Sequence, residues 1–280
     1  MKVAVIGAAG AMGSFFVKYF LGKGQDVVGS DANRVAGFPA GFTFVGSNRD
    51  AALGADAVIV AVPMRMTANV VREISPSLKR GAKLVEMTSV KGRMHAELRR
   101  IIALRKATLL SIHPLFGPLS KSKNLKICVI GNRRDEASAR LLFPGAKTIL
   151  LGAEEHDRLM AYTLSLVHLL NLAFVSTVDS GVGVKEFRRI ATPLASAQLD
   201  LGQAVLSQNP LLLAHIQAEN PFLPDVLSHV ISQLEGFRGW LEEKDITKFE
   251  KQFSGLAARF RRTGLDDALR WVYLASNSSP

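Results

Sequence analysis

Short apolar runs alternate with amphipathic stretches through the first half of the chain. The apolar runs predict β-strands, and they lie at residues 3–6, 26–31, 42–45, 57–62, 83–87, 108–112, 125–130 and 147–151. Amphipathic stretches such as 67–78 and 94–104 separate several of these runs. The alternation predicts an α/β fold, in which a mostly parallel, doubly wound sheet carries helices on both faces. Its ligands should bind at the carboxyl ends of the strands.

The pattern changes near Gly152, where helical periodicity replaces the alternation. The helical segments lie at 154–178, 184–206, 225–243, 247–261 and about 265–275, with turns at Asn209-Pro210 and Asn220-Pro221. No strand signal occurs in this half. We therefore predict two domains, a dinucleotide-binding domain over residues 1–152 and an all-helical domain over 153–280. The helical domain should supply a dimer interface and part of a substrate site.

A glycine turn follows the first strand and points to the ligand of that domain. The turn contains three glycines, a helix opens after it, and the next strand ends in Asp31, 18 residues beyond Gly13. This is the context of a Rossmann-type fold, in which the N–H groups at a helix N-terminus bind phosphate and an acid binds the adenosine ribose. The predicted cofactor-binding residues are Gly7, Ala9, Gly10, Ala11, Met12, Gly13 and Asp31.

The acid at the second strand also bears on the choice between NAD and NADP. A carboxylate at Asp31 would repel a 2′-phosphate and favours NAD. Asn33 and Arg34 follow immediately and could accept that phosphate, so NADP remains an alternative.

Composition restricts the class and the compartment. Hydrophobic residues make up 48% of the 280 residues, which excludes a disordered chain. The single cysteine, Cys128, lies in an apolar run, and the chain enters a strand at Lys2 without a signal peptide, so we expect a cytoplasmic protein. Residues 159–178 carry no formal charge and are long enough to span a bilayer. Their interspersed polar side chains favour a bundle core or a subunit interface over a membrane span.

Charge is unevenly distributed between the two halves. Residues 1–150 carry 23 Lys and Arg against 9 Asp and Glu, a balance of +14, whereas residues 151–280 carry 12 against 15, a balance of −3. A positive field attracts anionic cofactors and substrates. The basic clusters have no interleaved aromatic residues for base stacking, so solvated faces are favoured over a nucleic-acid site.

Three predicted strands end in residues that could serve a site at the carboxyl edge. Val62 and Pro63 could turn the backbone across the cofactor, or could simply end a strand. Ser89 could bond a catalytic imidazole or a substrate hydroxyl, or could be a helix N-cap, and Lys91 could pair with a carboxylate. His113 stands at the tip of a buried strand, where Pro114 and the Gly117-Pro118 turn fix the backbone after it, and this position suits a general base.

The helical half offers a second set of candidates. The segment His156-Asp157-Arg158 could cap and charge the start of a long helix. His168 lies on an apolar helix and could be a core histidine or a ligand. Arg188 and Arg189 are adjacent, and helical neighbours point about 100° apart, so at least one can face inward. No metal site is expected.

Together these residues resemble the prephenate/arogenate dehydrogenase family of tyrosine biosynthesis. The resemblance covers nearly the whole chain. It rests on the turn from Gly7 to Gly13, Ala61-Val62-Pro63, Ser89-Val90-Lys91, His113-Pro-Leu-Phe-Gly-Pro118, His156-Asp157-Arg158, His168 and Arg189-Ile190-Ala191. Because 280 residues leave no room for a chorismate mutase segment or a regulatory domain, the monofunctional form is implied.

The resemblance implies an NAD-dependent oxidative decarboxylation of prephenate to 4-hydroxyphenylpyruvate. His113 and Ser89 would be the catalytic residues. His113 would take the proton of the ring C4 hydroxyl as hydride leaves, and Ser89 would orient either His113 or the same hydroxyl. Arg189, His168 and Lys91 would bind the dianionic substrate, with Val62 and Pro63 near the nicotinamide.

Departures from the family pattern keep alternatives open. Leu119-Ser120-Lys121 replaces a frequent acid, and Leu164 stands where many members have serine. Arg189 sits in a shortened version of its motif, so Arg188 remains a rival for the substrate carboxylate. Arogenate remains an alternative to prephenate, and NADP an alternative to NAD. More distant alternatives are a β-hydroxyacid or imine reductase, and a non-catalytic sensor that binds NAD and uses its basic face on nucleic acid.

Overall fold

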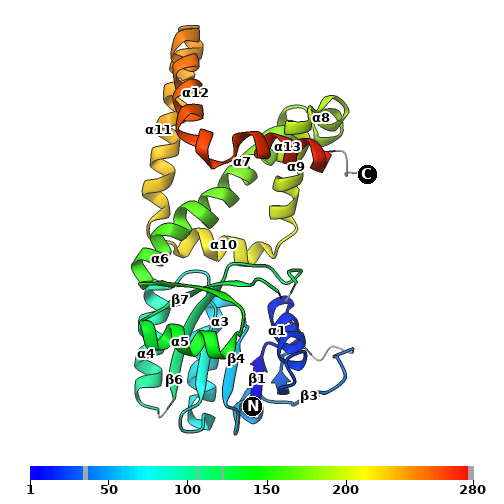
Figure 1. The fold of residues 1–280 in the computed structure, drawn as a ribbon, viewed down its shortest axis with the longest axis vertical. Helices are drawn as coiled ribbons and strands as arrows, with labels where there is room; N and C mark the ends of the chain where they lie inside the picture. Colours follow the sequence, from blue (N-terminus) through cyan, green and yellow to red (C-terminus); the bar gives the residue numbers. More distant parts are fainter. Residues whose placement is uncertain (34–36, 106, 122, 277–280) are drawn as a thin grey trace. The chain divides into compact units, whose positions relative to one another are not determined.

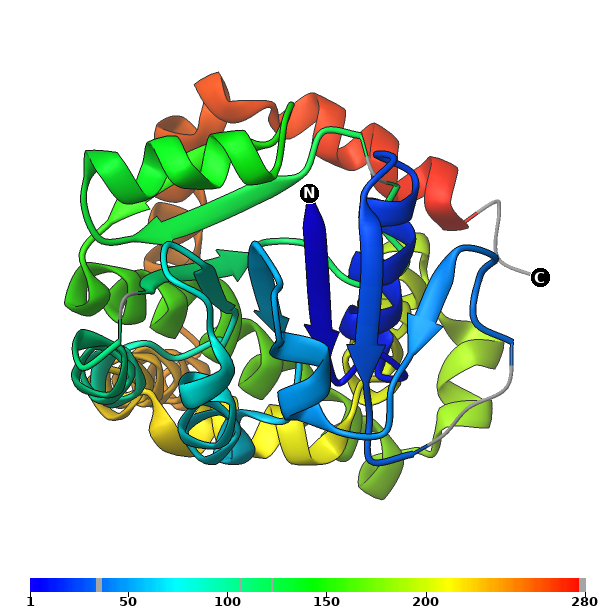
Figure 2. The same ribbon diagram turned by 90° about the horizontal axis from the view of Figure 1, so that it is seen from below.

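The first half of the chain forms one eight-stranded sheet. The computed structural model describes residues 1–33, 37–105, 107–121 and 123–276, and the strands in it follow the order β3-β2-β1-β4-β5-β6-β7-β8. Figure 2 shows β1 with β2 and β3 on one side and β4 on the other. The bounds are β1 Lys2–Ile6, β2 Asp26–Ser30, β3 Phe42–Phe44, β4 Ala57–Val60, β5 Lys83–Glu86, β6 Thr108–Pro114, β7 Lys126–Ile130 and β8 Lys147–Leu151.

All neighbouring strands pair in parallel except β6 and β7, which are antiparallel with His113 opposite Cys128. The predicted strands and the mostly parallel, doubly wound sheet are therefore confirmed. The reversal places the carboxyl end of β6 and the start of β7 at the same edge, because antiparallel neighbours run in opposite directions.

Helices cover both faces of the sheet because successive strand side chains point to opposite faces. Val3 and Val5 pack with α1 (Ala11–Leu21) and α5 (Arg133–Leu142). Ala4 belongs to a second hydrophobic core on the opposite face of the sheet. That second core includes α2 (Asn48–Ala52), α3 (Met64–Ile74) and α4 (Gly92–Ala103), with η1 (Ser75–Ser77) after α3. Aromatic side chains of α1, including Phe16 and Phe20, pack around Phe143 with tilted rings.

The second half is helical, as expected, and no strand occurs among its described residues (Figure 1). Its first helix runs from Ala153 to Gly181 and includes a π-helical stretch, η2. The bounds are α6 Ala153–Met160, η2 Ala161–Leu166, α7 Val167–Gly181, α8 Val184–Ile190, α9 Pro193–Leu206, α10 Pro210–Glu219, α11 Leu223–Glu242, α12 Ile246–Phe260, η3 Arg261–Thr263 and α13 Leu265–Ser276.

Two differences from the expected helices have local causes. The single segment expected over 184–206 is divided, because Pro193 has no N–H to continue a helix and Thr192 caps α9 by accepting a hydrogen bond from Ala195 N at 3.3 Å. The turn at Asn209 begins a further helix, α10, since its side chain accepts the Leu212 N–H at 3.1 Å.

The chain divides into two units, Met1–Leu159 and Met160–Pro280. The division lies within the long helix, a few residues after the pattern change near Gly152, and the boundary at 152/153 stays a prediction. That helix, Ala153–Gly181, is the one described helix with the length and apolar composition of a membrane span, a test that core helices also pass.

Candidate functional site

The glycine turn brings the start of α1 tightly against β1 and β4. Gly7 has a φ of +83°, and a Cβ there would lie 2.5 Å from the Ala61 carbonyl oxygen. A Cβ on Gly13 would lie 1.9 Å from the Gly7 carbonyl oxygen, so only glycine allows the helix to begin this close to the strand. Ala9, Gly10, Ala11 and Met12 retain exposed surface at this helix N-terminus. This cradle fits a pyrophosphate bound to backbone N–H groups.

Asp31 lies beside the same turn, directly after β2. Its Oδ2 accepts the Ala9 N–H at 2.9 Å and its Oδ1 accepts the Asn33 N–H at 2.9 Å. A carboxylate has about four lone-pair positions, so Asp31 keeps capacity for ribose hydroxyls. Of the two residues that could accept a 2′-phosphate, Asn33 is exposed and Arg34 lies outside the described residues.

The end of β4 meets the turn from the other side. Ala61 donates its N–H to the Ile6 carbonyl at 2.8 Å, and Val62 lies beside Gly7, where an added Cβ would contact it at 3.2 Å. Pro63 is exposed and is the N-cap of α3. The predicted cofactor-binding residues therefore come together at one edge of the sheet, as a dinucleotide site requires.

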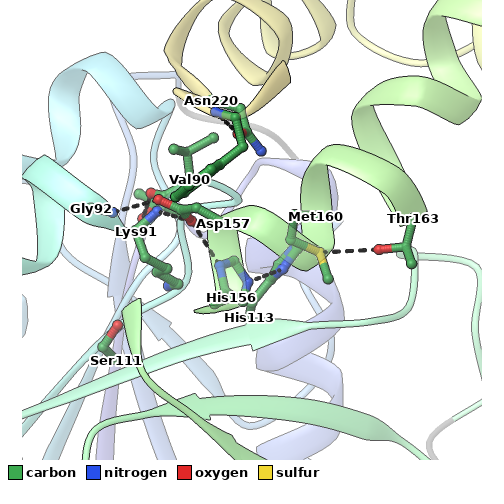
Figure 3. A network of polar contacts seen from close by, with 12 residues as sticks. Val90, Lys91, Gly92, Ser111, His113, His156, Asp157, Met160, Thr163 and Asn220 are labelled. Carbon is green, nitrogen blue, oxygen red and sulfur yellow. Dashed lines mark hydrogen bonds and ion pairs between the residues drawn. The ribbon is translucent and has the colours of Figure 1, made fainter. Parts of the chain in front are cut away.

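A second cluster surrounds His113 at the end of β6 (Figure 3). His113 is 7% exposed, and its Nδ1 lies 2.9 Å from Nε2 of His156 in α6. The Nδ1 of His156 in turn lies 2.8 Å from Oδ1 of Asp157. The sequence predicts that His156 and Asp157 cap a helix. In the structure they form hydrogen bonds with residues more than forty positions earlier in the chain.

Asp157 is fixed by the start of α4. Its Oδ1 accepts the Lys91 N–H at 2.8 Å, and its Oδ2 accepts the Gly92 N–H at 2.7 Å. These N–H groups have no partner inside their own helix, and the helix dipole places positive charge there. The N-cap alternative for Ser89 is wrong, because the N-cap of α4 is Lys91. Ser89 is half-buried in the segment before it, and a contact with His113 stays a prediction.

The side chain of Lys91 is fully buried. Its Nζ donates to Glu86 Oε1 at 2.8 Å and to the Ile112 carbonyl at 2.6 Å. Glu86 is also fully buried and accepts from the hydroxyl of Ser111 and from the Thr88 N–H. Lys91 does pair with a carboxylate, but with one inside the protein. This burial argues against the expected substrate contact, because the ammonium has no exposed surface.

Burial and charge set the protonation of this cluster. Burial lowers the pKa of His113 well below its ordinary value, and the nearby Lys91 ammonium and His156 add to the effect. Burial alone would raise the pKa of Glu86, but Lys91, Ser111 and Thr88 together hold it below its ordinary value. Burial also lowers the pKa of Lys91 against the attraction of Glu86. His113 is therefore a neutral imidazole near neutral pH, the form that can accept a proton.

The remaining candidates belong to the second unit. His168 is 8% exposed, and its Nδ1 lies 3.4 Å from the Gln217 amide nitrogen. Three residues earlier, the buried Ser165 hydroxyl in η2 has no hydrogen-bond partner among the described residues, and such groups mark sites for water or ligand. Burial lowers the pKa of His168. Its role as a substrate ligand stays a prediction.

The two arginines of α8 differ in their partners. Arg189 forms an ion pair with Glu186 three residues earlier, and both side chains are largely exposed. Arg188 bonds Asp200 of α9 at 2.6 Å and Gln203 at 2.8 Å. An exposed ion pair within one short helix contributes little free energy. Arg189 can therefore leave Glu186 for another carboxylate at a smaller free-energy cost than Arg188 can leave its partners. Within the described residues, no cluster of His, Cys, Asp and Glu is placed to hold a metal ion.

Comparison with known proteins shows the same division of the chain. Two protein-family models match, the prephenate dehydrogenase nucleotide-binding domain over residues 21–126 and the prephenate dehydrogenase dimerization domain over residues 152–255. Together they span three quarters of the chain.

Individual relatives and a solved structure agree. A probable arogenate/prephenate dehydrogenase of Methanocaldococcus jannaschii is 27% identical, with 93% of this chain and 61% of that protein covered. A 4-amino-4-deoxyprephenate dehydrogenase of Streptomyces pristinaespiralis is 28% identical, with 80% and 79% covered. The crystal structure of prephenate dehydrogenase from A. aeolicus with hydroxyphenyl propionate and NAD+ shares the fold, at a TM-score of 0.76, 16% identity, and 94% and 98% coverage.

The first curated relatives that the chain matches are longer proteins, of whose length the chain spans little more than half, from 55% to 61%. The match nevertheless includes both domain models in their order. The chain belongs to the prephenate/arogenate dehydrogenase family.

Proposed function

We propose that this protein catalyses the NAD-dependent oxidative decarboxylation of prephenate to 4-hydroxyphenylpyruvate in tyrosine biosynthesis. The observation that carries the proposal is His113, a buried and neutral imidazole at the carboxyl end of β6, in the unit that also contains the glycine cradle. The family assignment supports this chemistry over the reductase and sensor alternatives.

In this proposal, some residues bind the cofactor and the substrate, and His113 transfers the proton. The cradle and Asp31 hold the dinucleotide, which supplies a hydride acceptor when bound. His113 accepts the proton of the ring C4 hydroxyl as the hydride leaves C4, and loss of CO2 from C1 makes the ring aromatic. Arg189 binds a substrate carboxylate, which an arginine can hold in a bidentate contact. Because aromatisation drives the reaction, the protein mainly positions the substrate and takes the proton.

Prephenate is chosen over arogenate on the resemblance, and the relatives leave the side chain open, since their names include both compounds. NAD is chosen over NADP because the Asp31 carboxylate lies beside the turn, at 2.9 Å from Ala9 N, where it would repel a 2′-phosphate.

We further propose a cytoplasmic homodimer formed through the helical domain. The matched family model is a dimerization domain, and α7 exposes large apolar side chains, among them Val167 and Leu170 at 45% each. Exposed apolar residues three apart share one face of a helix. Light scattering of the purified protein should give twice the chain mass, and a monomer at micromolar concentration would contradict the interface.

The function is tested by the absorbance of reduced nicotinamide with prephenate and arogenate, each with NAD and with NADP. Prephenate with NAD should give the highest kcat/KM. The variant His113→Asn should bind NAD as the wild type does, measured by calorimetry, and lose turnover by about 10²–10⁴-fold. An inactive wild type that still binds NAD would refute the assignment. An unchanged His113→Asn rate would refute the role of His113.

A further inference from the structure

A continuous series of hydrogen bonds connects the start of α4 to His113. The backbone N–H groups of Lys91 and Gly92 donate to Asp157, Asp157 faces Nδ1 of His156, and Nε2 of His156 faces Nδ1 of His113. Figure 3 shows these residues and the hydrogen bonds that connect them. His156 has no exposed surface and Asp157 is 1% exposed, so water does not compete for these contacts.

The donor and acceptor of each hydrogen bond in the series follow from the backbone N–H groups at its start. A backbone N–H can only donate, so Asp157 accepts at both oxygens, and as a carboxylate it has no proton to give. His156 must therefore donate from Nδ1, and the neutral ring then carries its lone pair on Nε2. That lone pair accepts a proton from Nδ1 of His113. In neutral His113 the lone pair is then on Nε2.

We propose that His156 and Asp157 are positioning residues that hold His113 with its proton on Nδ1 and its lone pair on Nε2, ready to accept the substrate hydroxyl proton. The proposal rests on the proposed function for that last step. The tautomer itself does not depend on any substrate. The second imidazole extends the reach of the carboxylate, since His113 and Asp157 are joined through His156.

The same series also stabilises the product of proton transfer. When the hydroxyl proton binds Nε2, His113 becomes a cation in a buried position close to the Lys91 ammonium, which repels it. The Glu86 carboxylate is already paired with Lys91, so it does not offset this repulsion. Asp157 supplies the negative charge that balances the new cation, through the Nδ1–H of His113 and the ring of His156. The proton returns to solvent when His113 is next deprotonated.

A purely structural role is the competing explanation, because Asp157 also ties α6 to the start of α4. Two amide variants of His156 separate the roles. In His156→Asn the amide occupies the place of Nδ1, so it keeps the bond to Asp157 and loses the acceptor for His113. In His156→Gln the amide occupies the place of Nε2, so its oxygen can still accept from His113 while the bond to Asp157 is lost.

The direct test is ¹⁵N NMR of histidine-labelled protein above pH 7, with the His113 signal assigned through His113→Asn. Protonated and unprotonated ring nitrogens have distinct shifts, and wild-type His113 should show a proton on Nδ1. His156→Asn should lose this preference and His156→Gln should keep it more fully. With prephenate and NAD, kcat should fall by roughly 10²-fold or more in His156→Asn, with KM for NAD unchanged, and less in His156→Gln.

The outcomes are distinct. A wild-type His113 that is protonated on Nε2 in its neutral form would overturn the proposal, whether or not the protein turns over prephenate. A His156→Gln variant that is less active than His156→Asn would also overturn it, because a structural role alone predicts that order. An inactive wild type would overturn the proposed function, and the NMR result would still decide the tautomer.

Discussion

Removing the cation from the buried pair of Lys91 and Glu86 should destabilise the protein by an amount that depends on pH. Both side chains are fully buried, and Nζ lies 2.8 Å from Oε1. In Lys91→Met the apolar stem is kept and the ammonium is lost. Glu86 then either stays charged without its cation or takes up a proton. Protonation sets the upper limit of the cost, because the chain adopts the cheaper state.

The limit can be calculated from the ordinary pKa of glutamate, about 4.3. Protonating such a group costs about 1.4 kcal/mol for each pH unit above that value, or about 3.7 kcal/mol at pH 7.0 and about 1.6 kcal/mol at pH 5.5. The Ile112 carbonyl also loses its donor, which adds about 1 kcal/mol at both pH values. The sign follows from linkage: the unfolded variant binds fewer protons than the folded one above pH 4.3, so its stability falls as pH rises.

The assay is urea unfolding followed by circular dichroism at both pH values, with each variant compared with the wild type at the same pH. Lys91→Met should cost about 2 kcal/mol more at pH 7.0 than at pH 5.5. The double variant Glu86→Gln/Lys91→Met removes both charges of this pair and should recover most of the loss. Lys79→Met, which breaks the exposed pair with Asp56, should cost at most about 1 kcal/mol at either pH. An equal cost of Lys91→Met at both pH values would refute the reasoning.

Further predictions concern the proposed cofactor site, the proposed base and the proposed dimer interface. Gly13→Ala should weaken NAD binding by at least about 100-fold in calorimetry, because its Cβ would lie 1.9 Å from a carbonyl oxygen, whereas Gly46→Ala, in open space, should not. Asp31→Ser should raise kcat/KM for NADP relative to NAD, and an unchanged ratio would remove Asp31 from cofactor choice. The pKa of His113 is lower in the folded protein than in the unfolded chain, so the unfolded chain takes up this proton first as the pH falls below about 6.5. The free energy of unfolding therefore decreases between that pH and the folded pKa. In urea unfolding, His113→Asn should reduce this decrease by up to about 1.4 kcal/mol per pH unit. Leu170→Arg should yield monomers in light scattering if α7 forms the dimer interface.

The sheet could be predicted because its signals are local. Each strand is a short apolar run, and the close approach at Gly7 and Gly13 requires glycine whatever surrounds it. The position of His113 at a strand end also followed, since a buried strand ending at Pro114 fixes which residues reach the edge. The α10 helix was missed because Asn209-Pro210 reads as a turn, although the same pair is a helix N-cap and first position.

The cluster around His113 could not be predicted, because its bonds join residues far apart in the sequence. His156 is 43 residues from His113, and Asp157 is 66 residues from Lys91. Asp and His near the start of a helix are common as solvated charges, so nothing local marks these two as buried. The signal was the resemblance, which contained His156-Asp157-Arg158 without giving it a partner.

Lys91 shows why a motif can be recognised and its chemistry still be misassigned. A lysine after a strand end suggests a cation for the substrate. In this protein the side chain and the backbone of Lys91 make separate contacts, which the sequence does not distinguish. Its ammonium bonds Glu86 and the carbonyl of Ile112, the residue before His113. Its backbone N–H holds Asp157. The ammonium therefore stabilises the strand that carries His113, the proposed base. The backbone N–H, which any residue except proline would retain, holds Asp157 in the proposed positioning series.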